Sequence, residues 1–309
     1  MKVAVIGAGA MGCLYGAYIS KKHEVIMVDS YLPQVECIRK NGITIEELDG
    51  TTQNYKNITA EVSGEVKTAV DLVIMFVKST FTNDALEQNK MLFQPNTVVM
   101  TLQNGAGNDR KIAEYVKKEN IIIGTSKHNA INLGNGASRH GGMGATTIGS
   151  NHDATENLKL VEGILLDGGF EVVVSDDIQR IIWSKLLVNL SVNTFTAITE
   201  TPIGYMIQND YAWNFAKRLV YEAVEVAEAD GTYFDRKEAL ESVRQVCIEA
   251  GNGYSSMYQD RKKHVKMEID AINGAIVEQA KIYGVPTPYN SLVLDLIHAI
   301  EGGYEYLDK

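Results

Sequence analysis

Short apolar runs alternate with helical stretches over roughly the first 175 residues of this chain. The runs 3–6 and 24–28 are rich in β-branched side chains, and helical patterns cover 10–21 and 31–40. Such an alternation is typical of βαβ units, so it predicts an α/β domain with a mostly parallel sheet. Further buried strands are expected at 72–77, 97–102, 121–125, 145–148 and 170–174.

The pattern changes near residue 175, where the strand signal ends. Apolar positions recur at helical spacing over 212–227, and Asp230-Gly231 supplies a stop signal. Further helices are expected over 236–250, about 257–283 and 290–301. We therefore predict two domains, an α/β domain over 1–175 and an all-α domain over 176–309. Within the first domain, Asp49-Gly50 predicts a hairpin turn.

The composition narrows the function classes. Apolar residues make up 45% and charged residues 22%, and no apolar run reaches the roughly 18 residues of a membrane span. The net charge of -10 disfavours nucleic acid as a partner. Three widely spaced cysteines encode neither a disulfide framework nor a zinc site, so we expect no metal. Together with a first strand that begins without a signal peptide, this favours the cytoplasm.

A glycine-rich motif follows the first strand and opens the first helix. Gly7 permits a tight turn, Gly9 lets the backbone approach a pyrophosphate, and Gly12 allows close packing of helix and strand. Ala10 and Met11 stand at the helix start, where backbone N–H groups attract an anion. The motif predicts a dinucleotide cofactor.

Asp29 ends the second strand, where an acidic side chain accepts hydrogen bonds from the ribose of the cofactor. A 2′-phosphate would face like charge there, and Ser30 and Tyr31 offer no compensating cation. We therefore favour NAD(H) over NADP(H). The alternative is that Asp29 only caps the helix that begins near Leu32.

Three polar side chains interrupt the apolar helix around 181–192. Lys185, Asn189 and Asn193 recur every four residues and so share one helix face. Burying them without partners would cost several kcal/mol on usual scales, about 2–7 per group, so a ligand is expected there. A lysine in a partly dry pocket has a lowered pKa and can protonate a carbonyl oxygen as hydride arrives at carbon. The alternative is a solvated face with Lys185 extended to water.

Other polar residues are weaker candidates. Lys78 and Asn104 follow predicted strands and would lie at the edge of the sheet where ligands bind, although both could be ordinary loop residues. Ser256 and Gln259 have the spacing of a capping box. Glu268 is expected to have a catalytic role only if it lies beside a partner such as Lys185. His128 and His140 are expected at the surface or in hydrogen-bonded loops, and the basic run 261–266 is expected on a solvated face.

Several of these motifs together resemble the ketopantoate reductase family over essentially the whole chain. They are Gly7-x-Gly9-x-x-Gly12, Phe76-Val77-Lys78-Ser79, Gln103-Asn104-Gly105-x-Gly107-Asn108, Trp183-x-Lys185-x-x-x-Asn189-x-x-x-Asn193, Ser255-Ser256-Met257-x-Gln259-Asp260 and Glu268-Ile269-Asp270-x-Ile272-Asn273-Gly274. The lysine-asparagine and serine-glutamate motifs are specific to the family, whereas the glycine motif is shared with many dehydrogenases.

The resemblance implies an α/β Rossmann-type dinucleotide-binding domain over 1–175 and an all-α substrate and catalytic domain over 176–309. It also implies a role for each residue. Lys185 would be the general acid and Glu268 a catalytic carboxylate beside it. Asn104 and Lys78 would contact cofactor or substrate. Asn189 and Asn193 would bind substrate hydroxyls, and Ser256 would bind the substrate carboxylate. The reaction would be NAD(P)H-dependent reduction of a C3-branched 2-oxo acid to the D-2-hydroxy acid, with a second copy of the chain as a candidate partner in a homodimer.

Two departures from the family pattern bear on the substrate. Family members that bind pantoate carry asparagines where this chain has Gly253 and Ile203, so polar ligands for a substrate hydroxyl are missing. Together with Asp29, these changes favour NADH and a more apolar acid such as 2-oxoisovalerate or phenylglyoxylate, as in the D-mandelate dehydrogenase branch. The alternatives are a β-hydroxyacid dehydrogenase-like enzyme and a non-catalytic sensor of NAD(H).

Overall fold

The computed structural model describes residues 1–307, which form two compact units. The first unit comprises 1–103 and 107–178, and the second comprises 104–106 and the chain from 179 onward. The division thus falls at 178, against an expected boundary at 175. The inclusion of 104–106 in the second unit was not foreseen from the sequence.

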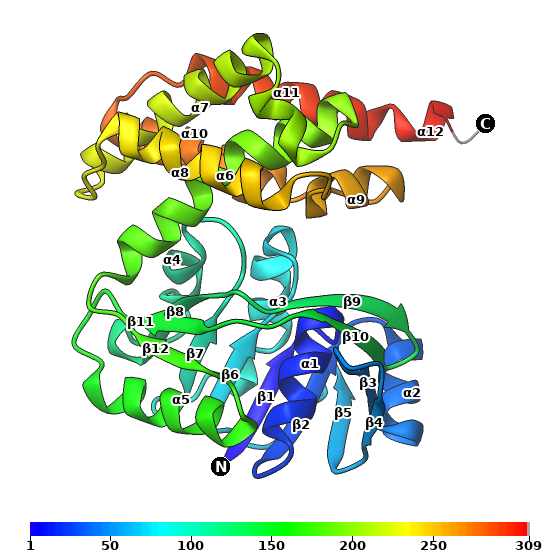
Figure 1. Ribbon diagram of the computed structural model, residues 1–309. Coiled ribbons are helices and arrows are strands. Elements are labelled where there is room, and N and C mark those ends of the chain that lie inside the picture. The colour runs from blue at the N-terminus through cyan, green and yellow to red at the C-terminus, as the bar shows by residue number, and fades with distance from the viewer. Residues whose placement is uncertain (308–309) are drawn as a thin grey trace. The chain divides into compact units, whose positions relative to one another are not determined.

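The core of the first unit is an eight-stranded sheet in the order β12-β11-β8-β7-β6-β1-β2-β5 (Figure 1). All neighbours run parallel except β8 and β11, which confirms the predicted mostly parallel α/β fold. Val5 lies between Met27 and Ile74 in register, and all three are buried. The strands are β1 (Lys2–Ile6), β2 (Glu24–Asp29), β5 (Ile58–Val62), β6 (Leu72–Met75), β7 (Val98–Thr101), β8 (Ile121–Ser126), β11 (Thr146–Gly149) and β12 (Val172–Val174).

A second, four-stranded sheet has the order β4-β3-β10-β9. The strands β3 (Ile43–Glu46) and β4 (Thr52–Tyr55) pair antiparallel across the predicted turn at Asp49-Gly50. The hairpin of β9 (Asn129–Gly134) and β10 (Ala137–Gly142) was not predicted, and neither was β5. The residues of β9 are mostly exposed, so this strand is defined by its main-chain pairing with β10. A strand of this kind needs no apolar run and therefore gives no signal in the sequence.

Helix α1 (Ala10–Ile19) is buried on nearly all sides because it contacts β1 and β2, the small sheet and α5 (Thr155–Gly168). Its fit is close: a Cβ at Gly16 would lie 2.4 Å from the sulfur of Met27. The other helices of this unit are α2 (Leu32–Asn41), α3 (Thr82–Gln88), α4 (Asn108–Ile112) and the 3₁₀ turns η1 (Ser79–Phe81), η2 (Lys90–Leu92) and η3 (Lys118–Asn120).

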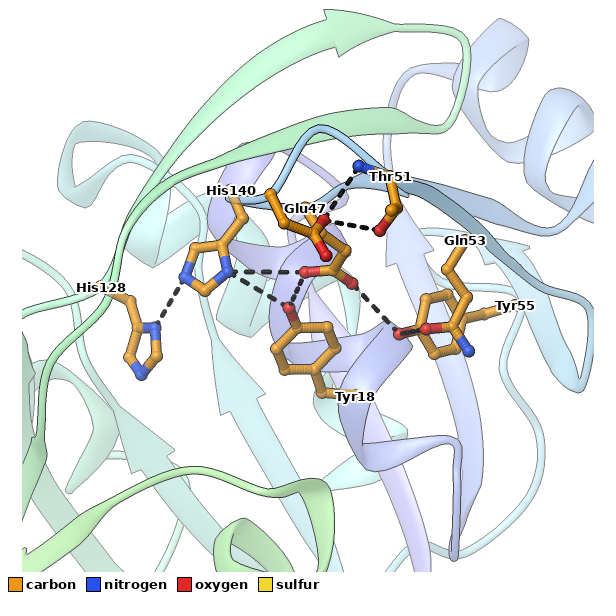
Figure 2. Close-up of polar contacts among 8 residues, drawn as sticks. Tyr18, Glu47, Thr51, Gln53, Tyr55, His128 and His140 are labelled. Atoms are coloured by element: carbon orange, nitrogen blue, oxygen red, sulfur yellow. Dashed lines mark hydrogen bonds and ion pairs between the residues drawn. The ribbon is translucent and has the colours of Figure 1, made fainter.

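A buried polar chain joins α1 to the small sheet (Figure 2). Tyr18 donates to Glu47 over 2.5 Å and lies 3.2 Å from Nδ1 of His140, whose Nε2 is 3.0 Å from Nδ1 of His128. His128 is only 9% exposed and His140 only 4%, so neither lies at the surface. Both are hydrogen-bonded, which was the other expectation, His128 in the loop before β9 and His140 within β10. Their burial could not be seen in the sequence, because the pairing of β9 with β10 was not predicted.

The second unit is helical, as predicted. The predicted single helix over 257–283 is wrong, because the chain leaves helical geometry after α9 and resumes it at α10. His264 has a left-handed φ of 51°, and Met267 and Ile269 are completely buried at a spacing that one helix face does not allow. The elements are α6 (Ile178–Thr199), η4 (Ile203–Ile207), α7 (Asp210–Ala229), α8 (Arg236–Ala250), α9 (Ser256–Lys262), η5 (Ile269–Ala271), α10 (Asn273–Tyr283), α11 (Pro288–Gly302) and α12 (Tyr304–Leu307).

Helix α6 passes through the apolar core of the second unit. Within the described residues it is the one helix long and apolar enough to cross a membrane by composition. Its side chains Trp183, Leu187 and Leu190 are instead buried in the core cluster, together with residues of α7, α8 and α10. Arg261 of α9 donates to the carbonyls of Ala197 and Ile198 and so caps the carboxyl end of α6. Arg261 therefore departs from the solvated face expected for 261–266.

Candidate active site

The glycine loop of the first unit has the shape that the motif predicts. Gly7 has a φ of 104°, and a Cβ there would lie 2.6 Å from the backbone nitrogen of Val77. A Cβ on Gly12 would lie 1.8 Å from the carbonyl oxygen of Gly7. A Cβ on Gly9, in contrast, would meet no atom of the described residues within 4 Å. The loop is thus closely packed at Gly7 and Gly12 and open at Gly9, where a pyrophosphate would approach.

The amino terminus of α1 is suited to an anion. Gly9 is its N-cap and provides no side-chain hydrogen bond, and the first turn contains no acidic residue. The first backbone bond of the helix runs from the Cys13 N–H to the Gly9 carbonyl, so the preceding N–H groups, including those of Ala10 and Met11, are available to a ligand. These residues fit a dinucleotide phosphate.

Asp29 is held beside the glycine loop by two backbone hydrogen bonds. Its Oδ2 accepts from the Ala8 N–H over 2.7 Å, and its Oδ1 accepts from the Tyr31 N–H over 2.9 Å. The alternative that Asp29 caps α2 is wrong, because the N-cap of α2 is Tyr31 and no side chain caps it. A carboxylate has about four acceptor sites, so Asp29 retains capacity for ribose hydroxyls.

Two strand ends predicted to lie near a ligand are linked by a glutamine. Gln103, after β7, donates from Nε2 to the carbonyl of Val77, after β6, over 2.7 Å. Lys78 follows Val77 and precedes η1, and it is partly buried. Asn104 follows Gln103 but belongs to the second unit. The structure therefore assigns these two predicted ligands to different units.

In the second unit, three segments that are far apart in the sequence supply one polar cluster. Asn104 donates from Nδ2 to Oε2 of Glu268 over 3.2 Å. Glu268 also interacts electrostatically with Lys185 of α6. The loop reaches this position by close backbone contact, since a Cβ on Gly105 would lie 2.0 Å from the carbonyl oxygen of Ala271. Lys185, the partner that a catalytic role of Glu268 requires, is thus present.

The electrostatics of Lys185 match those of a proton donor. Burial lowers the pKa of its ammonium below the ordinary lysine value, and the negative charge of Glu268 partly offsets this shift. Further along the same face of α6, Asn189 is partly buried and Asn193 is 9% exposed. The stripe is therefore a buried polar face, and the alternative of a solvated face is wrong.

The amino terminus of α9 lies against α6. The N-cap is Ser255, whose Oγ accepts from the Tyr258 N–H, so the predicted capping box of Ser256 and Gln259 is wrong. Ser255 is also 2.7 Å from the hydroxyl of Thr196 on α6, whereas the adjacent Ser256 is exposed. Ser256 is thereby placed on a firmly held helix start and is accessible to a ligand.

Sequence reasoning missed the residues that hold these segments together. Asn273, completely buried at the start of α10, donates from Nδ2 to the Leu190 carbonyl of α6 and to Asn290. Asn290 in turn donates to Glu222, a carboxylate that also accepts the Tyr289 N–H. Asn273 stood in the family motif that ends at Gly274, but no role was assigned to it.

Comparison with known proteins assigns the family. Residues 3–153 match the family model described as ketopantoate reductase PanE/ApbA, and residues 177–301 match its C-terminal counterpart. The chain belongs to the ketopantoate reductase family. A 2-dehydropantoate 2-reductase of Pyrococcus horikoshii is 33% identical over 302 residues, with 97% of this chain and 98% of the relative covered. One of Halobacterium salinarum is 31% identical over 299 residues, with 96% and 98% covered.

Solved structures agree with this assignment. A ternary structure of D-mandelate dehydrogenase with NADH and anilino(oxo)acetate has a TM-score of 0.91 and 31% identity, and the match covers 98% of this chain and 99% of that one. Membership in the ketopantoate reductase family makes this chain an oxidoreductase that acts on 2-oxo acids with a nicotinamide cofactor. The alternative of a β-hydroxyacid dehydrogenase-like enzyme is thereby excluded.

Proposed function

We propose that the protein reduces a C3-branched 2-oxo acid to the D-2-hydroxy acid and uses NADH in preference to NADPH. The observation that carries the proposal is the buried polar face of α6, where Lys185 interacts with Glu268 and Glu268 accepts from Asn104. Reduction of a ketone requires a hydride at carbon and a proton at oxygen. A lysine whose pKa is lowered by burial is a suitable source of that proton.

Lys185 protonates the carbonyl oxygen of the substrate in this mechanism. NADH, when bound at the glycine loop, supplies the hydride. Glu268 keeps the ammonium charged in its partly dry surroundings, because a nearby anion favours the protonated form. Asn104 fixes one oxygen of Glu268, which restricts the orientation of the carboxylate. Donors fixed before the reaction stabilise charge that develops in the transition state.

Substrate binding is assigned to the rest of the same unit. Asn189 and Asn193 continue the face that carries Lys185, and each offers an amide to a polar substrate group. Ser256 stands at the exposed amino end of α9, and we assign it to the substrate carboxylate. The D configuration is supported by the D-mandelate dehydrogenase structure at 31% identity.

The preference for NADH rests on Asp29. Its carboxylate is fixed beside the glycine loop by Ala8 and Tyr31, the position from which it would accept the ribose hydroxyls. A 2′-phosphate at the same place would meet this negative charge. The D-mandelate dehydrogenase neighbour contains NADH, which favours the same choice.

The two departures from the family pattern lie next to each other in the structure. The Ile203 N–H donates to the Gly253 carbonyl over 2.9 Å, and the Gly204 N–H donates to the Gly251 carbonyl over 2.7 Å. Ile203 packs into the apolar core, and Gly253 is exposed without a side chain. Neither position therefore offers a side-chain ligand to a terminal hydroxyl, whereas Asn252 is exposed beside them.

The test is a comparison of catalytic efficiencies for ketopantoate, 2-oxoisovalerate and phenylglyoxylate, each with NADH and with NADPH. An unpaired hydroxyl in an apolar pocket costs about 1–3 kcal/mol, so we expect 2-oxoisovalerate to exceed ketopantoate by about five- to a hundredfold. A strong preference for ketopantoate that disappears in Asn252→Ala would show that Asn252 replaces the missing ligands and would overturn this substrate. Binding of NADH without turnover of any acid would instead indicate a sensor.

A further inference from the structure

His298 lies between the carboxylates of Asp270 and Glu301. Asp270 is two residues from Glu268 in the sequence, and Glu301 is hydrogen-bonded to the residue before Glu268. Nε2 of His298 is 2.8 Å from Oδ1 of Asp270, and its Nδ1 is 3.1 Å from Oε2 of Glu301. Asp270 belongs to η5, two residues after Glu268, whereas His298 and Glu301 both belong to α11. The histidine therefore connects the segment that carries Glu268 to a long helix of the same unit.

Glu301 holds this segment at a second point. Its other oxygen, Oε1, accepts the N–H of Met267 over 2.7 Å, and Met267 directly precedes Glu268. The side chains of Met267 and Ile269 are completely buried in the apolar core. The segment is thus tied to α11 on both sides of Glu268, through the Met267 N–H and the Asp270 side chain, and its apolar side chains are held in the core.

The contacts of His298 depend on its protonation. A neutral imidazole has one N–H, whereas an imidazolium donates from both ring nitrogens. Because both nitrogens of His298 face carboxylate oxygens, only the charged ring makes two hydrogen bonds. Loss of the proton places a ring lone pair against one carboxylate.

The neighbouring charged groups do not replace this connection. Lys266 lies 3.6 Å from Oδ2 of Asp270, but both residues belong to the same segment, so this pair makes no link to α11. Tyr304 of α12 interacts electrostatically with Glu301, as it does with Arg261 and Asp260 of α9. Among the hydrogen bonds and ion pairs described for these groups, the contact of His298 with Asp270 joins η5 to α11.

We propose that His298 is a positioning residue whose imidazolium ties the 267–270 segment to α11 and so orients Glu268 toward Lys185 and Asn104. This inference rests on the proposed function of Glu268. His298 is assigned no contact with substrate or cofactor. The pair of contacts is partly exposed, with side-chain exposures of 41% for His298 and 47% for Asp270, so water screens the attraction and the effect on rate is modest.

Three variants of the protein test the proposal by steady-state kinetics with the best 2-oxo acid. His298→Gln keeps a polar side chain but cannot carry a positive charge, and it should lower kcat by about two- to fivefold with little change in KM. His298→Arg keeps a cation that can bridge two carboxylates and should restore kcat. His152→Gln, a change at an exposed histidine of the first unit, is the control.

Equal kcat values for wild type and His298→Gln would overturn the proposal. Hydrogen exchange at the Met267 amide gives a second readout that does not depend on turnover. This amide is protected by Glu301, and we expect faster exchange in His298→Gln than in wild type or His152→Gln. If wild type reduces no 2-oxo acid, the proposed function fails, and unchanged exchange would then also reject the connection through His298.

Discussion

The cofactor loop and the polar face of α6 are built in opposite ways. The loop and its acidic residue lie within residues 7–29 of one βαβ unit, and their contacts are mostly between backbone atoms. The cluster around Lys185 draws side chains from a loop after β7, from α6 and from the segment before η5. A backbone site is therefore encoded locally, whereas a side-chain site requires the tertiary fold.

This difference also sets what each site can tolerate. In the loop, Gly12 contacts Gly7 so closely that no side chain fits between them. The anion would be bound there by backbone N–H groups, which every residue except proline possesses. Around Lys185, in contrast, the chemistry depends on one ammonium. Substitutions in the loop should therefore affect folding or cofactor binding, and substitution of Lys185 should affect the chemical step.

The largest effect is expected from Lys185→Ala. Loss of the proton donor should lower turnover by about 10²- to 10⁴-fold, the range typical of general acid catalysis. NADH affinity should change little, because the glycine loop belongs to the other unit. Single-turnover kinetics and NADH titration measure the two quantities separately, and near wild-type turnover would remove Lys185 from the mechanism.

A second experiment compares glycines of the loop. Gly12→Ala places a methyl group 1.8 Å from the Gly7 carbonyl oxygen and should lower the free energy of unfolding by about 1–3 kcal/mol or more. Gly9→Ala meets no atom of the described residues, so it should leave stability nearly unchanged but weaken NADH binding by filling the space for the pyrophosphate. Denaturant unfolding and NADH titration measure both effects.

The matched control is Gly163→Ala, in the interior of α5. A Cβ there also meets no neighbouring atom within the described part of the chain, and replacing a helical glycine by alanine should raise stability by about 0.5–1 kcal/mol. NADH binding should be unaffected. If Gly9→Ala bound NADH as well as the control does, the open front of the loop would not be the pyrophosphate site.

Local pattern predicted the large sheet, the glycine loop and most helices of the second unit, because each is encoded by residues adjacent in sequence. The β9–β10 hairpin was missed because its strands are stabilised by pairing, and the break after α9 was missed because Glu301 and the core determine it. The polar stripe on α6 was visible from its spacing. Glu268, which interacts with Lys185, and Asn104, which donates to Glu268, had only weak local signals, and their roles entered through family resemblance.

Asp29→Ala should have an intermediate effect, on cofactor choice. Removing the ribose acceptor should weaken NADH by about tenfold, in line with hydrogen bonds to charged groups, and loss of the negative charge should improve NADPH. The ratio of kcat/KM for the two cofactors is the measurement. Because Asp29 also accepts from Ala8 and Tyr31, a thermal melt is needed to separate a loosened loop from a lost ribose contact. A wild-type preference for NADPH would contradict the assignment.

The smallest effect is expected at His128, far in sequence from both sites. Burial lowers the pKa of His128 below the ordinary histidine value, and the neighbouring His140 lowers it further, while Glu171 opposes the shift. Because the unfolded chain then takes up the proton more readily than the native protein, stability is lost as pH falls below about 6.5 and is unaffected well above it. His128→Asn should flatten this dependence, and His152→Asn, at an exposed position, should not. Urea unfolding at several pH values measures the slope, and an unchanged slope in His128→Asn would show that other groups of the first unit control its acid sensitivity.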